Sequence, residues 1–226
     1  MAFGERWLTA LWPFVAASLP AAPARVLELG CGPLGGFVPS LLANGYEASG
    51  VDRNAPAGEG YHQVDFEHLA PAEPVDAIVA SRSLHHVGDL RDVIARVAVA
   101  LRPGGSIVVA EWAWERFDDA TAQWCFERLG DADPADPGWL HRRRRGWLDS
   151  DLPWDAYFEG WAGGHGLHRA GAILAELGRC FETATCTYGP YFFADLADFA
   201  EDDERTAIES GAIRATGIRY AGTLGS

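Results

Sequence analysis

The hydrophobic positions of the chain fall into short apolar runs that alternate with segments of helical periodicity. Strands are predicted at residues 26–29, 47–51, 61–64, 75–80 and 107–110. The run 75–80 is apolar except for Asp76, as expected of a buried parallel strand. From Leu90 to Leu101 apolar side chains recur at every third or fourth position, which is typical of an amphipathic helix. Strands that alternate with helices predict an α/β fold with a doubly wound parallel sheet.

Beyond residue 112 the pattern is less regular. Helices are predicted at 117–129, 170–177 and, in an acidic segment, 195–209, and further strands at 181–187 and 213–220. Residues 130–168 are rich in Trp, Asp, Pro and Gly, and a structureless loop of that length is unusual in a compact domain. We therefore interpret this segment as a partly helical cap inserted over the strand ends.

The N-terminal segment 1–24 is expected to be a helical lead-in, in which Pro13 complicates one continuous helix. A chain of 226 residues fits a single domain, so we expect one domain spanning residues 1–226. Neither an apolar run long enough to cross a membrane nor a signal peptide is visible.

The first five predicted strands all end in a polar or small residue. These residues are Glu28, Asp52, Asp65, Ser81 and Glu111. Because ligands of open parallel sheets bind at the carboxyl ends of the strands, the sequence predicts a binding site along this edge.

A glycine-rich turn follows the first strand. Gly30, Gly32 and Gly35 satisfy G-x-G-x-x-G, and Asp52 follows where a ribose-binding acid is expected. Several nucleotide-binding families share this pattern. Glu28 lies directly before the turn and would repel a pyrophosphate, so it favours a ligand with a cationic part.

Five segments of the chain occur in the order and spacing of one family: the glycine turn, Asp52, Asp65-Phe66, residues 83–87 and residues 101–105. Together they resemble the class I S-adenosylmethionine (SAM) dependent methyltransferases, most closely the small-molecule group called type 11, over residues 25–112. The resemblance implies a Rossmann-like, seven-stranded, mostly parallel sheet with helices on both faces. One departure is that the third glycine, Gly35, comes one residue later than is common, after Leu34.

The resemblance also implies a set of contacts to SAM, whose product is S-adenosylhomocysteine (SAH). The set comprises Glu28, Gly30, Cys31, Gly32, Gly35, Asp52, Arg53, Asp65, Phe66 and Ser81. Glu28, directly or through water, and the backbone carbonyl of Ser81 would bind the methionine amine. Asp52 would accept from both ribose hydroxyls. Asp65 would accept from the adenine amino group, with Phe66 covering the ring and Arg53 beside it.

Catalytic candidates are His85 and His86, because a histidine at this strand edge titrates near neutral pH. A general base is needed only when the acceptor must lose a proton. The alternative for either histidine is support of the helix that follows.

Charge and cysteine content narrow the possible partners. The net charge of −14 opposes a nucleic-acid substrate, and the basic run Arg142–Arg145 is too short to reverse this. The four cysteines show no metal-ligand spacing, so we expect no metal and a cytoplasmic protein with reduced thiols. The partner expected is a small molecule, and no membrane contact is expected; the oligomeric state stays open.

The favoured hypothesis is therefore a SAM-dependent methyltransferase that acts on a small-molecule acceptor, by O- or N-methylation. A protein that binds SAM without methyl transfer, of a cyclase-like or regulatory kind, is the first alternative. A nicotinamide-dependent oxidoreductase is the second, and Glu28 and residues 101–105 argue against it.

Overall fold

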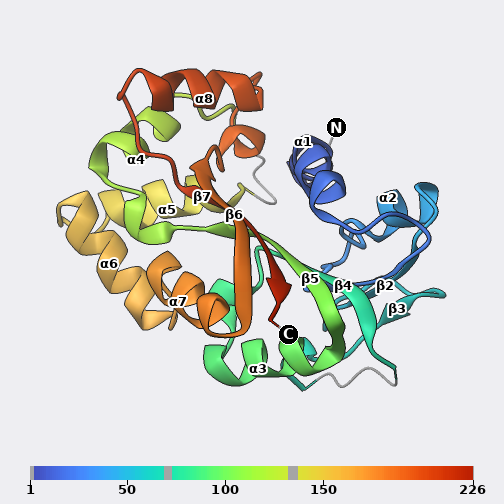
Figure 1. Ribbon diagram of the computed structural model, residues 1–226. Helices are drawn as coiled ribbons and strands as arrows, with labels where there is room; N and C mark the ends of the chain where they lie inside the picture. Colours follow the sequence, from blue (N-terminus) through green and yellow to red (C-terminus); the bar gives the residue numbers. More distant parts are fainter. Residues whose placement is uncertain (1–2, 69–72, 132–136, 226) are drawn as a thin grey trace. The chain divides into compact units, whose positions relative to one another are not determined.

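The structure is a computed structural model that describes residues 3–68, 73–131 and 137–225 (Figure 1). Its sheet has seven strands in the order β3-β2-β1-β4-β5-β7-β6. The strands are β1 (Arg25–Leu29), β2 (Glu47–Val51), β3 (Tyr61–His62), β4 (Val75–Ser81), β5 (Leu101–Trp112), β6 (Phe181–Gly189) and β7 (Gly217–Leu224). The pairs β3–β2, β2–β1, β1–β4 and β4–β5 are parallel, which confirms the predicted class of fold.

Eight α-helices and four short 3₁₀ helices lie within the described ranges. The α-helices are α1 (Phe3–Ser18), α2 (Val38–Ala43), α3 (Leu90–Ala100), α4 (Asp119–Phe126), α5 (Trp139–Leu148), α6 (Trp154–Gly164), α7 (Ala170–Cys180) and α8 (Glu201–Glu209). The 3₁₀ helices are η1 (Phe66–His68), η2 (Leu84–His86), η3 (Trp114–Arg116) and η4 (Phe193–Asp195). Helix α1 continues through Pro13. None of the helices described is both long and apolar enough to span a membrane.

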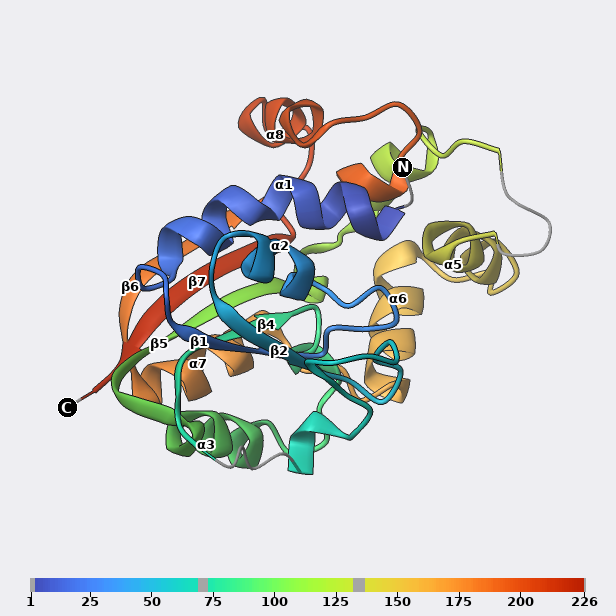
Figure 2. The same cartoon turned by 90° about the vertical axis from the view of Figure 1, so that its right-hand side faces the viewer.

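The chain divides into two compact units. The sheet unit comprises Leu8–Trp112, His168–Thr187 and Ile218–Ser226, and the aromatic unit comprises Met1–Trp7, Ala113–Leu167 and Tyr188–Gly217. In the sheet unit, α2 and the adjoining part of α1 lie on one face of the sheet, and α3 and α7 lie on the other (Figure 2). This arrangement follows from the amphipathic pattern, since Leu90, Val93, Ile94 and Val97 of α3 are all buried.

The aromatic unit is built around stacked and edge-to-face rings. Phe117 contacts Trp154, Phe158 and Phe192 at centroid distances of 5.1, 5.3 and 4.4 Å. The indole N–H of Trp154 donates to the Phe117 carbonyl at 2.7 Å, which satisfies a buried polar group. Trp154 and Phe158 of the predicted cap segment therefore lie in a core, whereas its other aromatic side chains in the described residues stay partly exposed.

The expected strand 213–220 is wrong at its start, because β7 begins at Gly217. The backbone of the preceding residues is bonded elsewhere: the Arg214 N–H donates to Thr121 Oγ1 at 3.1 Å. The Ala215 carbonyl accepts from Arg116 Nε at 2.6 Å. Groups bonded in this way are not available to a sheet ladder, and apolar periodicity does not reveal such bonds.

Strand β5 is longer than the predicted 107–110 and contains a bulge. Leu101 pairs with Val75 and Ser106 with Ala77, so residues 102–105 stand opposite Asp76 alone. Arg102 forms an ion pair with Asp76 at 2.6 Å, which accounts for the single charged residue within the apolar β4. Three other predicted elements are too long: β3 ends at His62, α4 covers only 119–126, and the acidic segment is α-helical only from Glu201.

Candidate functional site

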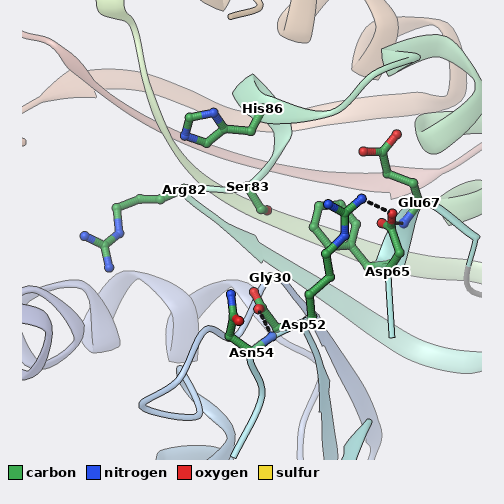
Figure 3. Close-up of a pocket in the computed structure, with 10 residues that line it drawn as sticks. Gly30, Asp52, Asn54, Asp65, Glu67, Arg82, Ser83 and His86 are labelled. Carbon is green, nitrogen blue, oxygen red and sulfur yellow. Dashed lines mark hydrogen bonds and ion pairs between the residues drawn. The ribbon is translucent and has the colours of Figure 1, made fainter. Parts of the chain in front are cut away.

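The carboxyl ends of β1, β2 and β4 contribute to a pocket within the sheet unit (Figure 3). It is lined by Gly30, Asp52, Arg53, Asn54, Asp65, Phe66, Glu67, Arg82, Ser83 and His86. Its cavity volume is about 230 Å³, slightly below the range typical of small-molecule sites, and its mouth is open to solvent. Six sequence candidates are brought together here: Gly30, Asp52, Arg53, Asp65, Phe66 and His86. The candidates that do not line this pocket are Glu28, Cys31, Gly32, Gly35, Ser81 and His85.

The glycine turn crosses from β1 to α2 against the end of β2. The N–H groups of Gly30 and Cys31 both donate to the Val51 carbonyl, at 2.8 and 3.2 Å. Gly30 has a φ of +76°, and a Cβ there would lie 2.5 Å from the Cβ of Ser83. Glycine is therefore required by both backbone conformation and space, and the turn stays close to the segment after β4.

Glu28 is buried beneath this turn and does not reach the pocket surface. Its carboxylate accepts from the Phe37 N–H at 2.6 Å, directly before α2 begins. Gly36 leaves the space in which the carboxylate sits, since a Cβ at Gly36 would overlap both of its oxygens. Burial raises the pKa of Glu28 to about 8, and the backbone hydrogen bonds offset part of this increase. Glu28 thus occupies the N-terminal end of α2, where a dinucleotide fold binds pyrophosphate.

Asp52 is the acid best placed to bind a diol. One carboxylate oxygen accepts from the Gly32 N–H at 3.1 Å and the other from the Asn54 N–H at 2.7 Å. The two bonds fix the orientation of a partly exposed carboxylate that lines the pocket. Each oxygen keeps a further lone pair for a ligand hydroxyl.

A second acid, Asp65, lies at one end of the pocket near Glu67 (Figure 3), and Arg53 and Phe66 also line the pocket. Asp65 forms an ion pair with Arg53 and accepts from the Glu67 N–H at 3.1 Å. The guanidinium of Arg53 is mostly exposed, so this pair is solvent-screened at the mouth. Glu67 in turn accepts from the Gly88 N–H at 3.0 Å, which links this end of the pocket to the segment that leads into α3.

After β4 the chain turns sharply at Arg82, which has a φ of +51°. A positive φ is uncommon for a residue with a Cβ and often marks a functional position. The Arg82 N–H donates to the Ala110 carbonyl at 2.9 Å, which holds the turn against β5. Ser81 is buried, whereas Arg82 and Ser83 line the pocket.

The two histidines differ in their surroundings. His85 is buried, with Nδ1 at 2.6 Å from Glu111, whereas His86 is exposed and lines the pocket. Their rings lie against each other at a centroid distance of 4.0 Å. His85 is therefore suited to support, and His86 is the one of the two that can meet a ligand.

Glu111 holds the segment after β4 in place. It is buried and accepts from the N–H groups of Ser83 and Leu84, both at 2.6 Å, as well as from that of Trp112 at 2.9 Å. Burial raises the pKa of Glu111, but three effects together lower it below its usual value: the charge of His85, the hydrogen bond from His85, and the N–H groups of Trp112 and Leu84.

Sequence reasoning missed four pocket residues: Asn54, Glu67, Arg82 and Ser83. All of them lie within two residues of a predicted candidate, so a wider window around each strand end would have included them. No group of His, Cys, Asp and Glu within the described ranges is arranged to hold a metal.

Comparison with known proteins places these features in a family. A protein-family model described as a methyltransferase domain matches residues 5–162, which is more than half of the chain. Trans-aconitate 2-methyltransferase of Methylobacterium nodulans is 35% identical over 100 residues, which is 39% of this chain and 38% of the relative. Ubiquinone biosynthesis O-methyltransferase of Bradyrhizobium is 30% identical over 38% of this chain and 39% of the relative. The chain thus spans well under half of the length of these relatives.

Solved structures share the fold over nearly the whole chain. A SAM-dependent methyltransferase of Mesorhizobium loti matches 95% of this chain and 97% of its own, with a TM-score of 0.56 and 21% identity. The N-methyltransferase NodS of Bradyrhizobium japonicum, solved with SAH, matches 99% of this chain and 88% of its own, with a TM-score of 0.56 and 16% identity. The chain therefore belongs to the methyltransferase domain family, and it shares its fold with SAM-dependent methyltransferases.

Proposed function

We propose that this chain transfers the methyl group of SAM to an oxygen or nitrogen of a small-molecule acceptor. The observation that carries the proposal is the placement of Glu28 and Asp52 around one turn. Glu28 occupies the N–H group that a pyrophosphate would need, while Asp52 presents two oriented oxygens to the pocket. This combination favours a ribose without a pyrophosphate, which describes SAM and argues against NAD(P).

The nucleoside part of SAM fits the residues that line the pocket. Asp52 would accept from the two ribose hydroxyls, and the Phe66 ring would cover the adenine. Asp65 would accept from the adenine amino group, with Arg53 beside it. Gly30 would let the backbone approach the ligand, since any side chain there would collide with Ser83.

The remaining candidates would act through the turn. Gly32 orients Asp52, Gly35 leaves room for the Tyr61 hydroxyl, and the buried Cys31 is the small residue between the glycines. The side chain of Glu28 would reach the methionine amine only through water, because it does not line the pocket. The Ser81 carbonyl is the remaining acceptor proposed for that amine.

SAM supplies a methyl group already activated on a sulfonium, so the protein must mainly position donor and acceptor and exclude water. His86 is the proposed general base for an acceptor that must lose a proton, because it lines the pocket beside Ser83. His85 is proposed to support it through the ring contact and the bond to Glu111.

The acceptor class is proposed from the relatives. Their names specify trans-aconitate and ubiquinone biosynthesis, so a carboxylate or a phenol-like hydroxyl is the acceptor chemistry to test first. A cytoplasmic location rests on the sequence alone and stays a prediction.

Ligand binding and methyl transfer test the proposal together. A ligand present at 100 times its dissociation constant adds about 2.7 kcal/mol, hence a melting shift of roughly 5–10 °C in a domain of this size. We expect such a shift with SAM and SAH and none with NAD(P)H; the reverse pattern would overturn the proposal. Methyl transfer from labelled SAM to a panel of carboxylates, phenols and amines then separates an enzyme from a protein that only binds SAM.

A further inference from the structure

The basic run of helix α5 has no part in the pocket at the strand ends. Helix α5 lies beside α6 in the aromatic unit (Figures 1 and 2) and carries four consecutive arginines, at positions 142–145. Because the chain has a net charge of −14, four adjacent cations are a local exception. The surroundings of each arginine decide whether it supports the fold or is available to a partner.

One face of α5 packs against the aromatic core. Leu140 is buried, and the Trp147 ring stacks on Phe126 at a centroid distance of 5.9 Å. The Arg143 guanidinium lies over the Trp161 ring, 4.5 Å from its centroid. Positions 140, 143 and 147 follow the spacing of the buried stripe of a helix. Arg143 therefore belongs to the inner face, where packing on an aromatic ring accounts for it.

The outward side of α5 presents cations next to apolar side chains. Arg142, Arg144 and Arg145 are exposed, and Leu148 in the last turn of the helix is 62% exposed. Positions 144 and 145 precede 148 by four and three residues, so these side chains emerge on one side of the helix. Leu152, which is 49% exposed, follows in the next turn. We call these five residues the basic face.

Arg144 and Arg145 lack the acidic neighbours that other exposed arginines have. Exposed arginines that pair with an acid are Arg25, Arg53, Arg96, Arg102, Arg179, Arg205 and Arg214. In the part of the chain that the structure describes, neither Arg144 nor Arg145 forms an ion pair. Two adjacent cations without a counter-charge attract an anionic surface over about a Debye length.

Leu152 is held in place at the edge of the basic face. The indole N–H of Trp147 donates to the Leu152 carbonyl at 2.9 Å, and the Ser150 hydroxyl donates to the Trp147 carbonyl at 2.7 Å. Because Trp147 itself packs against the core, the turn cannot fold Leu152 inward without loss of these bonds. The basic face thus keeps apolar area in the solvent beside its cations, a combination that marks contact sites for other proteins.

Charge selects among the possible partners. A second copy of the chain that met this face across a two-fold axis would place arginines against arginines. An anionic membrane or a nucleic acid is an extended surface, whose charge would also act on the rest of a chain with a net charge of −14. A protein surface can contact the basic face alone.

We propose that the basic face of α5 binds the surface of an acidic protein on which apolar side chains lie among Asp and Glu residues. Carboxylates of the partner pair with the guanidinium groups of Arg144 and Arg145, which offer two parallel N–H donors each. Apolar side chains of the partner cover Leu148 and Leu152. The interaction goes beyond methyl transfer and does not depend on it.

A synthetic peptide serves as the probe. It is an amphipathic helix of about 20 residues, with Glu on one face and Leu on the other. Fluorescence anisotropy of the labelled peptide should show binding to the wild type. The double variant Arg144→Gln, Arg145→Gln should weaken this binding at least about fivefold. The matched control Arg91→Gln, Arg96→Gln removes the same charge from the exposed side of α3 and should change it less than about twofold.

The leucines have a test of their own. Leu148→Ser, Leu152→Ser should weaken peptide binding several-fold, because apolar contact area is lost. Both side chains are exposed, so the melting temperature should shift by less than about 4 °C. SAH affinity should be the same in the wild type and in all three double variants, which checks that each variant is folded.

Four outcomes would overturn the inference. They are a wild type that does not bind the peptide, equal affinity for a peptide with Gln in place of every Glu, equal losses in the α5 and α3 arginine variants, and binding to phosphatidylglycerol vesicles in place of the peptide. A dimer that the α5 arginine variant abolishes would assign the basic face to a second copy of the chain instead.

Discussion

Glu28 shows how one buried side chain can decide what a glycine turn binds. The turn itself satisfies a dinucleotide pattern, but its carboxylate neighbour takes the Phe37 N–H and fills the space over Gly36. The sequence indicated this preference through charge repulsion. The structure gives a different reason, because burial raises the pKa of Glu28 to about 8 and the N–H group that would bind a phosphate is already used.

The overlap at Gly36 predicts a difference between two glycines of the turn. Both Gly36 and Gly32 have positive φ values, of +58° and +62°, so alanine at either position costs about 1–2 kcal/mol of backbone strain. A Cβ at Gly36 also overlaps the Glu28 carboxylate, whereas one at Gly32 meets no atom within 4 Å. Gly36→Ala should therefore lower the free energy of unfolding by roughly 1–3 kcal/mol more than Gly32→Ala in urea titrations. Equal losses would mean that the turn has room over Glu28.

A change of Asp52 should weaken the binding of SAH. Asp52→Asn keeps the size of the side chain but loses an acceptor for one ribose hydroxyl, and we expect SAH affinity to fall at least about tenfold by calorimetry. Glu59→Gln is the matched control, because it changes an exposed acid of the same loop that does not line the pocket. If Asp52→Asn bound SAH like the wild type, the ribose assignment would be wrong.

Among the elements, the segment from Ser83 to Val87 depends most on contacts that are distant in sequence. Glu111 of β5 accepts from two of its N–H groups and from the His85 ring. From its other side, His168 donates its backbone N–H to the His85 carbonyl at 3.0 Å, and the His168 ring lies 2.8 Å from the Val87 carbonyl. The segment that carries Ser83 and His86 is therefore fixed at both ends.

Removal of Glu111 should release this segment. Glu111→Ala leaves buried N–H groups and the His85 ring without their partner, so we expect a loss of about 3–5 kcal/mol in the free energy of unfolding. Glu182→Ala removes an exposed acid from β6 and should change it by less than about 0.5 kcal/mol. A loss of under 1 kcal/mol in Glu111→Ala would show that the segment is held by other contacts.

The sequence predicted elements where local pattern decides them. Strands β1, β2 and β4 and helix α3 were predicted within one residue of their ends. For β4 and α3 the reason is that an apolar run and the 3.6-residue period follow directly from burial. The start of β7 was not predictable, since it depends on bonds from Thr121 and Arg116 to residues about a hundred positions away. For the same reason the sequence could not tell His85 from His86: only the position of Glu111 separates the supporting ring from the exposed one.

For the whole molecule, two buried acids link stability to pH. Burial raises the pKa of Glu28 to about 8 and that of Glu204 to about 7, although backbone N–H groups bind both. Glu204 accepts from the N–H groups of Tyr191 and Phe193, at 2.9 and 2.6 Å. Because these pKa values lie above the usual 4.5, the folded protein holds protons that the unfolded chain releases.

The sign of this effect gives a prediction for the wild type. The free energy of unfolding should fall as pH rises from about 4.5 to about 8. Each of the two acids contributes a loss of roughly 1.4 kcal/mol for every pH unit that lies between its unfolded and its folded pKa. The double variant Glu28→Gln, Glu204→Gln should show a flatter dependence of melting temperature on pH between 5 and 9. Parallel curves for the variant and the wild type would show that neither acid is held protonated.

The central claim is that SAM binds in the pocket around Asp52, with its ribose at Asp52 and its adenine toward Asp65. A crystal structure of the protein with SAH tests this claim most directly. It should show the ribose hydroxyls within hydrogen-bond distance of Asp52 and the adenine against Phe66. Electron density for SAH at any other place, or in the reverse orientation with adenine at Arg82, would contradict it.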